Sequence, residues 1–148
     1  MVPVRGKVCP DFAFDLCVER IKPEEARALD LSAWHTVFDG AEPIRADTID
    51  RFSRAFAEAG FRREAFFPCY GLAEATLFVS GGPWGQGPST LDVSRSALEE
   101  KQVGPARAGD RLRLVSSGAP AEAQTVRIVD PDTLAPCDDR RVGEIWVS

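Results

Sequence analysis

Tyr70, Gly71 and Glu74 are the residues of this sequence whose types and spacing are best suited to chemistry. They lie in the stretch FFPCYGLAEATLFVSGG, residues 66–82. A tyrosine ring offers a flat face on which a purine can stack, an interaction worth roughly 1–3 kcal/mol by analogy with base stacking on aromatic residues. A glycine lets a ligand approach the backbone closely, and a carboxylate suits Mg²⁺ held jointly with phosphates. The stretch therefore predicts part of a nucleotide site.

The same side chains also have a purely structural interpretation. Tyr70 fits a half-buried aromatic residue of a strand. Glu74 fits an acidic residue near the start of a helix, where the helix dipole favours a negative charge. Residue types alone leave both interpretations open.

A second candidate is the stretch FDGAEP, residues 38–43, where a short apolar strand runs into Gly40 and Ala41 before a helix. Loops at the carboxyl ends of parallel strands are where α/β proteins bind ligands. Two neighbouring strands with glycine loops at matching ends would build one site. Taken alone, this loop also fits an ordinary turn between a strand and a helix.

Other chemistries fit the sequence poorly. Cys69 suggests a thiol nucleophile with His35 as its base, but nothing apart from strand adjacency brings the two together, and a cysteine after FFP is typical of a small buried hydrophobic residue. The four cysteines form no C-x-x-C pair, and the single histidine has no metal-ligand partner at zinc-like spacing. The glycines of residues 81–87 match neither G-x-G-x-x-G nor the P-loop pattern.

These candidates must be positioned by alternating helices and strands. Apolar spacing predicts helix over residues 12–29, with Pro23 opening a second short helix, and a strand over WHTVFDG, residues 34–40. A further helix is predicted from Asp47 to Ala59, with Asp47 as its N-cap and Gly60 as its stop. The strand EAFFPCYG follows and leads into a helix that holds Glu74. This order predicts parallel pairing of the two strands through a crossover, the signature of an α/β layer.

The second half of the chain is β-rich. After the Gly/Pro loop GGPWGQGPS, a short helix is predicted over residues 94–101, followed by three strands in LRLVSSG, TVRIVDPDT and VGEIWVS. Asp130-Pro131-Asp132 supplies the turn between the last two. Because the last strand stops at Ser148 with no closing turn, we expect these residues to be a segment of a longer chain.

Length and composition exclude several classes of protein. The 148 residues, with 44% hydrophobic and 28% charged, are typical of about one folded domain. A net charge of -5 disfavours sequence-independent binding of nucleic acid, which needs clustered Lys and Arg. No apolar run reaches the roughly 20 residues of a membrane helix, and the first residues are too short and polar for a signal peptide. The sequence therefore predicts a cytoplasmic protein without a membrane span.

Three stretches together resemble one family, the fatty acyl-AMP ligases of the adenylate-forming (acyl-CoA synthetase-like) superfamily. They are DLSAWHTVFDGAEPIRADTIDRF, FFPCYGLAEATLFVSGG and GEIWVS, and the resemblance runs from about Asp11 to Ser148. It implies that the fold is a fragment of the large N-terminal domain of such an enzyme. It also implies that a fatty acid is activated with ATP and Mg²⁺ to an acyl-adenylate, for transfer to an acyl carrier protein or polyketide synthase.

The resemblance assigns roles to individual residues. The tyrosine matching Tyr70 stacks on adenine, and the glutamate matching Glu74 is the catalytic residue that holds Mg²⁺. The strand before Tyr70 walls the acyl tunnel. The expected nucleotide-binding residues are Gly40, Ala41, Glu42, Pro43, Cys69, Tyr70, Gly71, Leu72 and Ala73.

The resemblance also divides the chain and sets its limits. It implies an α/β part over residues 1–91, a family-type insertion over 92–118 that disfavours the CoA reaction, and an incomplete β-rich subdomain over 119–148. The phosphate loop with its lysine, the ribose-binding aspartate and the C-terminal domain have no counterpart in these residues, so we expect the segment alone to be inactive. The alternatives are a non-catalytic domain that binds adenylate or a carrier protein, and an acyl-CoA ligase.

Overall fold

A five-stranded mixed sheet organises the computed structural model, which describes residues 6–75, 77–122 and 124–148. The strand order is β1-β2-β3-β4-β7. The parallel strands are β1 (Gly6–Cys9), β2 (Thr36–Asp39) and β3 (Phe66–Tyr70), whereas β4 (Ser80–Gly81) and β7 (Ala119–Pro120) continue the sheet antiparallel. The predicted parallel pairing of β2 with β3 is confirmed, and with it the α/β layer.

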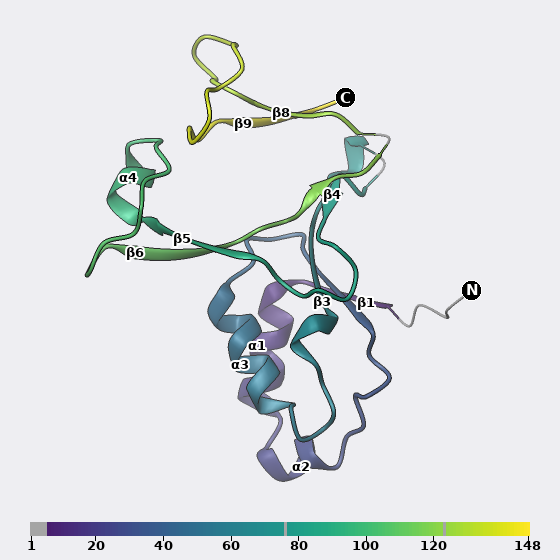
Figure 1. Cartoon of the computed structure of the whole chain (residues 1–148). Helices are drawn as coiled ribbons and strands as arrows, with labels where there is room; N and C mark the ends of the chain where they lie inside the picture. The colour runs from purple at the N-terminus through teal and green to yellow at the C-terminus, as the bar shows by residue number, and fades with distance from the viewer. Residues whose placement is uncertain (1–5, 76, 123) are drawn as a thin grey trace.

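Two helices, α1 (Asp11–Arg20) and α3 (Ala46–Ala55), lie side by side and form the core with the parallel strands (Figure 1). Phe14 of α1 packs edge-on against Phe52 of α3 and Phe66 of β3, with ring centroids 5.1 and 5.0 Å apart. Ile49, Phe52 and Phe56, the predicted apolar stripe, are all buried. The short helix α2 (Pro23–Arg27) begins at the proline, as predicted.

The predicted limits of α3 are wrong at both ends. Arg45, not Asp47, is the N-cap residue, and the helix ends at Ala55 rather than Ala59. Arg45 is held in place by a buried partner, because its Nε donates to Asp11 Oδ2 of α1 at 2.9 Å and its backbone N–H donates to Asp11 Oδ1 at 3.1 Å. A tertiary ion pair therefore sets where this helix begins.

The second half of the chain forms two antiparallel hairpins. The first joins β5 (Thr90–Ser94) to β6 (Arg111–Val115) around the short helix α4 (Arg95–Glu99), and the second joins β8 (Val126–Val129) to β9 (Glu144–Val147). The three strands predicted from the pattern are confirmed, whereas β1, β4, β5 and β7 were missed. The turn at Asp130 is confirmed as well, since its Oδ1 accepts from the backbone N–H groups of Asp132 and Thr133.

Asp110, the residue before β6, is hydrogen-bonded to the end of β5 and the start of α4. Ser94 Oγ and Ser96 Oγ donate to its carboxylate at 2.5 and 2.8 Å, and Ser94 Oγ also accepts from the Ala97 N–H that opens α4. These bonds, first that from Ser94 and then that from the Ser96 N–H, lower the pKa of Asp110 to about 2. The carboxylate therefore stays charged, and keeps these bonds, throughout the neutral range.

The helix predicted after β3 is absent. The chain leaves the strand at Gly71, makes a single 3₁₀ turn at Ala73–Ala75, and returns as β4 beside β3. The Leu72 carbonyl accepts from the N–H groups of both Ala75 and Leu77 and so closes a tight loop. The loop is too short for a helix because β-rich residues follow immediately and pair with the strand just completed. Among the described residues, no helix has both the length and the apolar character needed to cross a bilayer.

Candidate functional site

A cavity of about 450 Å³ opens at the edge of the sheet where β2 and β3 end. Because the strands are parallel and adjacent, the loops that follow them meet at this edge. The lining residues come from the loop after β2, the end of β3 and the end of β6: Ala41, Glu42, Pro43, Ile44, Cys69, Tyr70, Gly71, Leu114, Val115 and Ser117. Residues from the two stretches singled out in the sequence therefore line one cavity.

The loop after β2 is pressed closely against β3. A Cβ atom on Gly40 would lie 2.8 Å from the Cys69 carbonyl oxygen, so only glycine allows this approach. Ala41 then takes a left-handed conformation with φ 68, which costs roughly 1–3 kcal/mol for a residue with a side chain. Strain of this kind concentrates at ligand-binding loops, where the surrounding structure holds it in place.

Glu42 anchors this loop to the start of α1. Its Oε1 accepts from the backbone N–H of Phe12 at 2.5 Å, at a helix end where a negative charge is favoured. The carboxylate is therefore engaged by protein, and Glu42 contributes to the cavity as part of its wall. No signal within the loop sequence indicated this bond, which joins residues 30 positions apart.

Tyr70 and Gly71 form the opposite wall. The Tyr70 carbonyl accepts from the Val79 N–H at 3.0 Å, which fixes the end of β3 against the returning chain. A Cβ atom on Gly71 would lie 1.6 Å from the Leu77 carbonyl oxygen, so the loop that follows passes directly over this residue. Gly71 therefore makes room for the protein's own backbone, in addition to any ligand.

Replacing Gly71 with alanine is expected to destabilise the protein by about 1–3 kcal/mol, because the added methyl group forces the 71–78 loop away from β3. Urea denaturation of the full-length protein measures this loss. Gly82→Ala is the matched control, since a Cβ atom at Gly82 meets nothing within 4 Å. Equal stabilities for the two variants would contradict the close contact.

Leu72, Ala73 and Glu74 lie on the loop just beyond the cavity. Of the residues described, those that line the cavity include none of these three. Glu74 is exposed on the 3₁₀ turn, so solvent reaches its side chain. Within residues 6–75, 77–122 and 124–148, no three Asp, Glu, His or Cys side chains are grouped to hold a metal on their own.

Sequence reasoning missed the contribution of β6. Leu114, Val115 and Ser117 close one side of the cavity, and a bridge between Arg45 and Leu114 joins β6 to the loop before α3. The pattern in LRLVSSG predicted a strand but gave no sign of where that strand docks. Its place depends on contacts between residues far apart in the chain.

Asp39 at the end of β2 was also missed. Its side chain is fully buried, and neither carboxylate oxygen has a hydrogen-bond partner among the described residues. Burial, reinforced by the nearby charges of Asp11 and Glu42, raises the pKa of Asp39 to about 8. At neutral pH the carboxyl group of Asp39, the residue just before the Gly40–Ala41 turn, is therefore mostly protonated.

Cys69 and His35 lie apart and do not form a catalytic pair. His35 precedes β2 and contacts Arg62 at 3.1 Å, whereas Cys69 lies near the end of β3, at the opposite end of the parallel strands. Burial, and then the charge of Asp39, raise the pKa of the Cys69 thiol, which disfavours the nucleophilic thiolate.

Comparisons with known proteins agree with this architecture. The sequence profile of the AMP-binding enzymes matches residues 9–148. The medium-chain fatty acid–acyl-carrier-protein ligase JamA of Moorena producens is 44% identical over 142 residues, covering 93% of this chain and 24% of that protein. The long-chain fatty acid–AMP ligase FadD28 of Mycobacterium tuberculosis is 38% identical over 138 residues, covering 93% and 24%.

A solved structure gives the same result. The fatty acyl-adenylate ligase from Legionella pneumophila, crystallised with acyl adenylate and pyrophosphate, superposes with a TM-score of 0.89 at 51% identity, over 97% of this chain and 25% of that one. The chain thus spans about a quarter of the length of the relatives it matches. The resemblance to fatty acyl-AMP ligases is confirmed, and the chain belongs to the family of AMP-binding enzymes.

Proposed function

We propose that this chain forms the adenine-facing part of a fatty acyl-AMP ligase. Such an enzyme joins a fatty acid to AMP from ATP, releases pyrophosphate, and passes the acyl group to an acyl carrier protein or polyketide synthase. The observation that carries the proposal is the cavity at the ends of β2 and β3, which is lined by Tyr70 and by Ala41–Pro43 of the loop after β2. The names of the relatives support the same chemistry.

In this proposal the cavity walls hold the adenine. The ring of Tyr70 stacks on the base, and the Gly40–Pro43 loop, together with Cys69 and Gly71, shapes the pocket around it. The cavity volume of about 450 Å³ lies within the range of small-molecule sites. Leu72 and Ala73 carry the chain from the base toward the phosphates.

Glu74 is proposed as the residue that holds Mg²⁺. A single carboxylate fits this ion, because Mg²⁺ keeps several waters and is usually bound by one or two carboxylates together with substrate phosphates. Bound there, the ion would neutralise charge on the phosphates during adenylate formation. The exposed position of Glu74 on the turn beyond Tyr70 leaves its carboxylate open to such a ligand.

The division of the chain into residues 1–91, 92–118 and 119–148 is part of the same proposal. Residues 92–118 correspond closely to the β5–α4–β6 unit, which we propose is the insertion that disfavours the CoA reaction. β7 of the third segment joins the main sheet beside β4, so the third segment is continuous with the α/β layer. Residues 1–148 alone are proposed to be inactive, because most of the phosphate-binding and acyl-transfer machinery implied by the family resemblance has no counterpart in them.

ATP–pyrophosphate exchange with a fatty acid tests this function. The full-length protein is expected to catalyse exchange that depends on both the fatty acid and Mg²⁺, and the 148-residue chain alone is expected to show none. Product analysis with a phosphopantetheinylated carrier protein and with CoA then identifies the acceptor. Absence of exchange in the full-length protein would refute the ligase, and efficient CoA thioester formation would instead indicate an acyl-CoA ligase.

A further inference from the structure

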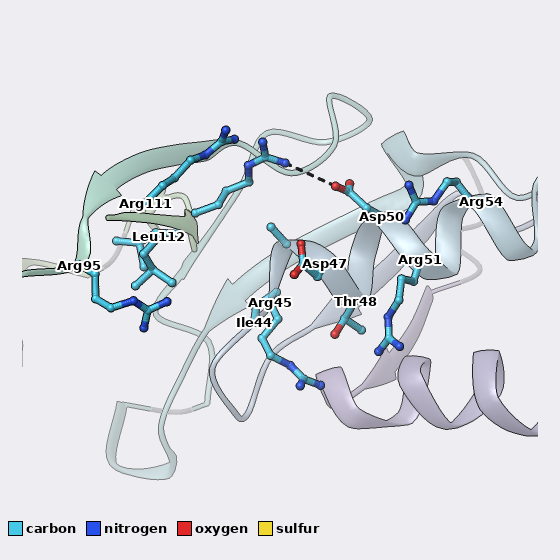
Figure 2. A pocket seen from close by; sticks show the side chains of 13 residues that line it. Ile44, Arg45, Asp47, Thr48, Asp50, Arg51, Arg54, Arg95, Arg111 and Leu112 are labelled. Atoms are coloured by element: carbon cyan, nitrogen blue, oxygen red, sulfur yellow. Dashed lines mark ion pairs between the residues drawn. The ribbon is translucent and has the colours of Figure 1, made fainter. Parts of the chain in front are cut away.

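A second and larger cavity, which we call the arginine groove, lies between α3 and the β5–β6 hairpin. It measures about 1020 Å³. It is lined by six arginines, two aspartates and a few smaller side chains: Arg45, Arg51, Arg54, Arg95, Arg111, Arg113, Asp47, Asp50, Ile44, Ala46, Thr48, Leu112 and Leu114. Figure 2 shows Arg51 and Arg54 on α3 at one side and Arg95 of α4 and Arg111 of β6 at the other, while the side chains of Arg45 and Arg51 point toward α1.

The groove is basic on a chain that is acidic as a whole. Its six arginines face two aspartates, whereas the full sequence has a net charge of -5. Clustered guanidinium groups repel one another, so gathering them in one groove costs free energy unless nearby anionic groups offset the repulsion. Part of that offset is internal to the protein.

Four of the six arginines are engaged by neighbouring carboxylates. Arg45 and Arg51 pair with Asp15, and Arg45 also pairs with Asp11. On the hairpin side, Arg111 and Arg113 pair with Asp92 at 2.9 and 3.2 Å, and Arg113 reaches Asp50 at 3.6 Å, the dashed line in Figure 2. Each guanidinium has five N–H donors, so these pairs do not use all of them.

Arg54 and Arg95 are different. Neither has a carboxylate within 4.0 Å among the described residues, although both line the groove. Arg54 comes from the last turn of α3 and Arg95 from the first residue of α4, so the two uncompensated charges enter from separate elements. Their charge is therefore available to a bound anion.

The groove also has an apolar side and adjoins the first cavity. Leu112 and Leu114 come from β6, and Leu114 is 37% exposed. Ile44 and Leu114 line both cavities, so a molecule in the arginine groove lies one side chain away from the proposed adenine pocket.

We propose that the arginine groove docks a protein partner through a segment of that partner rich in Asp and Glu, with an apolar side chain seated on Leu112 and Leu114. Arginine forks match carboxylates in geometry and are enriched at protein interfaces. The spread of the guanidinium groups favours a protein segment over a small anion, because they come from α3, the residue before it, α4 and β6. The proposal does not depend on the adenylation chemistry.

A binding experiment on the full-length protein tests the docking. The probe is a fluorescein-labelled synthetic peptide of Glu pairs alternating with Leu, followed by fluorescence anisotropy at low salt, with a Gln-for-Glu peptide as the neutral comparison. The double variant Arg54→Gln/Arg95→Gln is expected to bind the acidic peptide at least about tenfold more weakly, since each lost bond is to a charged group. Arg20→Gln/Arg127→Gln, which removes two exposed arginines elsewhere, is expected to bind as the wild type does.

The remaining outcomes overturn the proposal. Equal weakening in both double variants would mean general charge attraction, and equal binding of the Gln peptide would remove the role of the carboxylates. Displacement of the peptide by tripolyphosphate at concentrations where matched ionic strength has no effect would identify a small-anion site. Failure of the full-length protein to bind the acidic peptide would mean that the groove is closed, including closure by another part of the polypeptide.

Discussion

Replacing Glu74 with alanine in the full-length protein is expected to lower the rate of acyl-adenylate formation about 10²–10³-fold, the loss typical of removing one group that stabilises developing charge. Stability should change by less than about 0.5 kcal/mol, since Glu74 is exposed on a single 3₁₀ turn and makes no hydrogen bond or ion pair with the described residues. Pyrophosphate exchange measures the rate, and urea denaturation measures the stability.

The metal role of Glu74 is separable from a structural role. If the carboxylate holds Mg²⁺, the variant should need a higher Mg²⁺ concentration for half-maximal exchange, and Glu74→Asp should recover part of the activity. Glu122→Ala, at another exposed glutamate, is the control and should keep wild-type exchange. A large loss of stability in Glu74→Ala, or an unchanged Mg²⁺ requirement, would contradict the assignment.

The parts of the fold that the sequence predicted well depend on local pattern. The stripe of Ile49, Phe52 and Phe56 is buried as expected, and β2 and β3 pair in parallel through α3. Because parallel strands bring their carboxyl ends to one edge, the convergence of the Gly40 and Gly71 loops was also predictable from the sequence.

The features that were missed depend on contacts between distant residues. The start of α3 is set by Asp11, 34 positions before Arg45, and the turn after β3 is set by pairing with β4. The docking of β6 against the loop before α3 adds Leu114 and Val115 to the site. Local propensity carries no information about these partners. The sequence pattern could therefore indicate a strand or a helix cap, but it could not indicate where that strand or cap lies in the site.

The burial of Asp39, and the change in its pKa, could not be predicted from the sequence for the same reason. In the sequence it is the polar residue that ends a strand, and only the structure shows that it is fully buried with no partner for either oxygen among the described residues. The groups that face it are Asp11 of α1, Glu42 of the following loop and Cys69 of β3, and the two carboxylates raise its pKa further. A charged Asp39 would therefore be costly, and the proton it keeps links the stability of the Gly40–Ala41 turn to pH.

Asp39→Asn is accordingly expected to remove a pH dependence of stability. The pKa of Asp39 is about 8 in the folded protein against 3.8 for an unperturbed aspartate, so between those values the folded state binds more protons than the unfolded state. Stability contributed at this position is complete below pH 3.8 and falls by up to about 1.4 kcal/mol per pH unit as the pH rises toward 8. Urea denaturation of wild type and variant at several pH values from 5 to 8 (roughly the upper part of that range) measures the difference.

The variant should have the shallower slope of stability against pH and the higher stability at the alkaline end, whereas Asp139→Asn, at an exposed carboxylate, should follow the wild type. Parallel slopes for Asp39→Asn and the wild type would show that Asp39 is ionised in the folded protein, and that the full-length chain supplies its carboxylate with a partner.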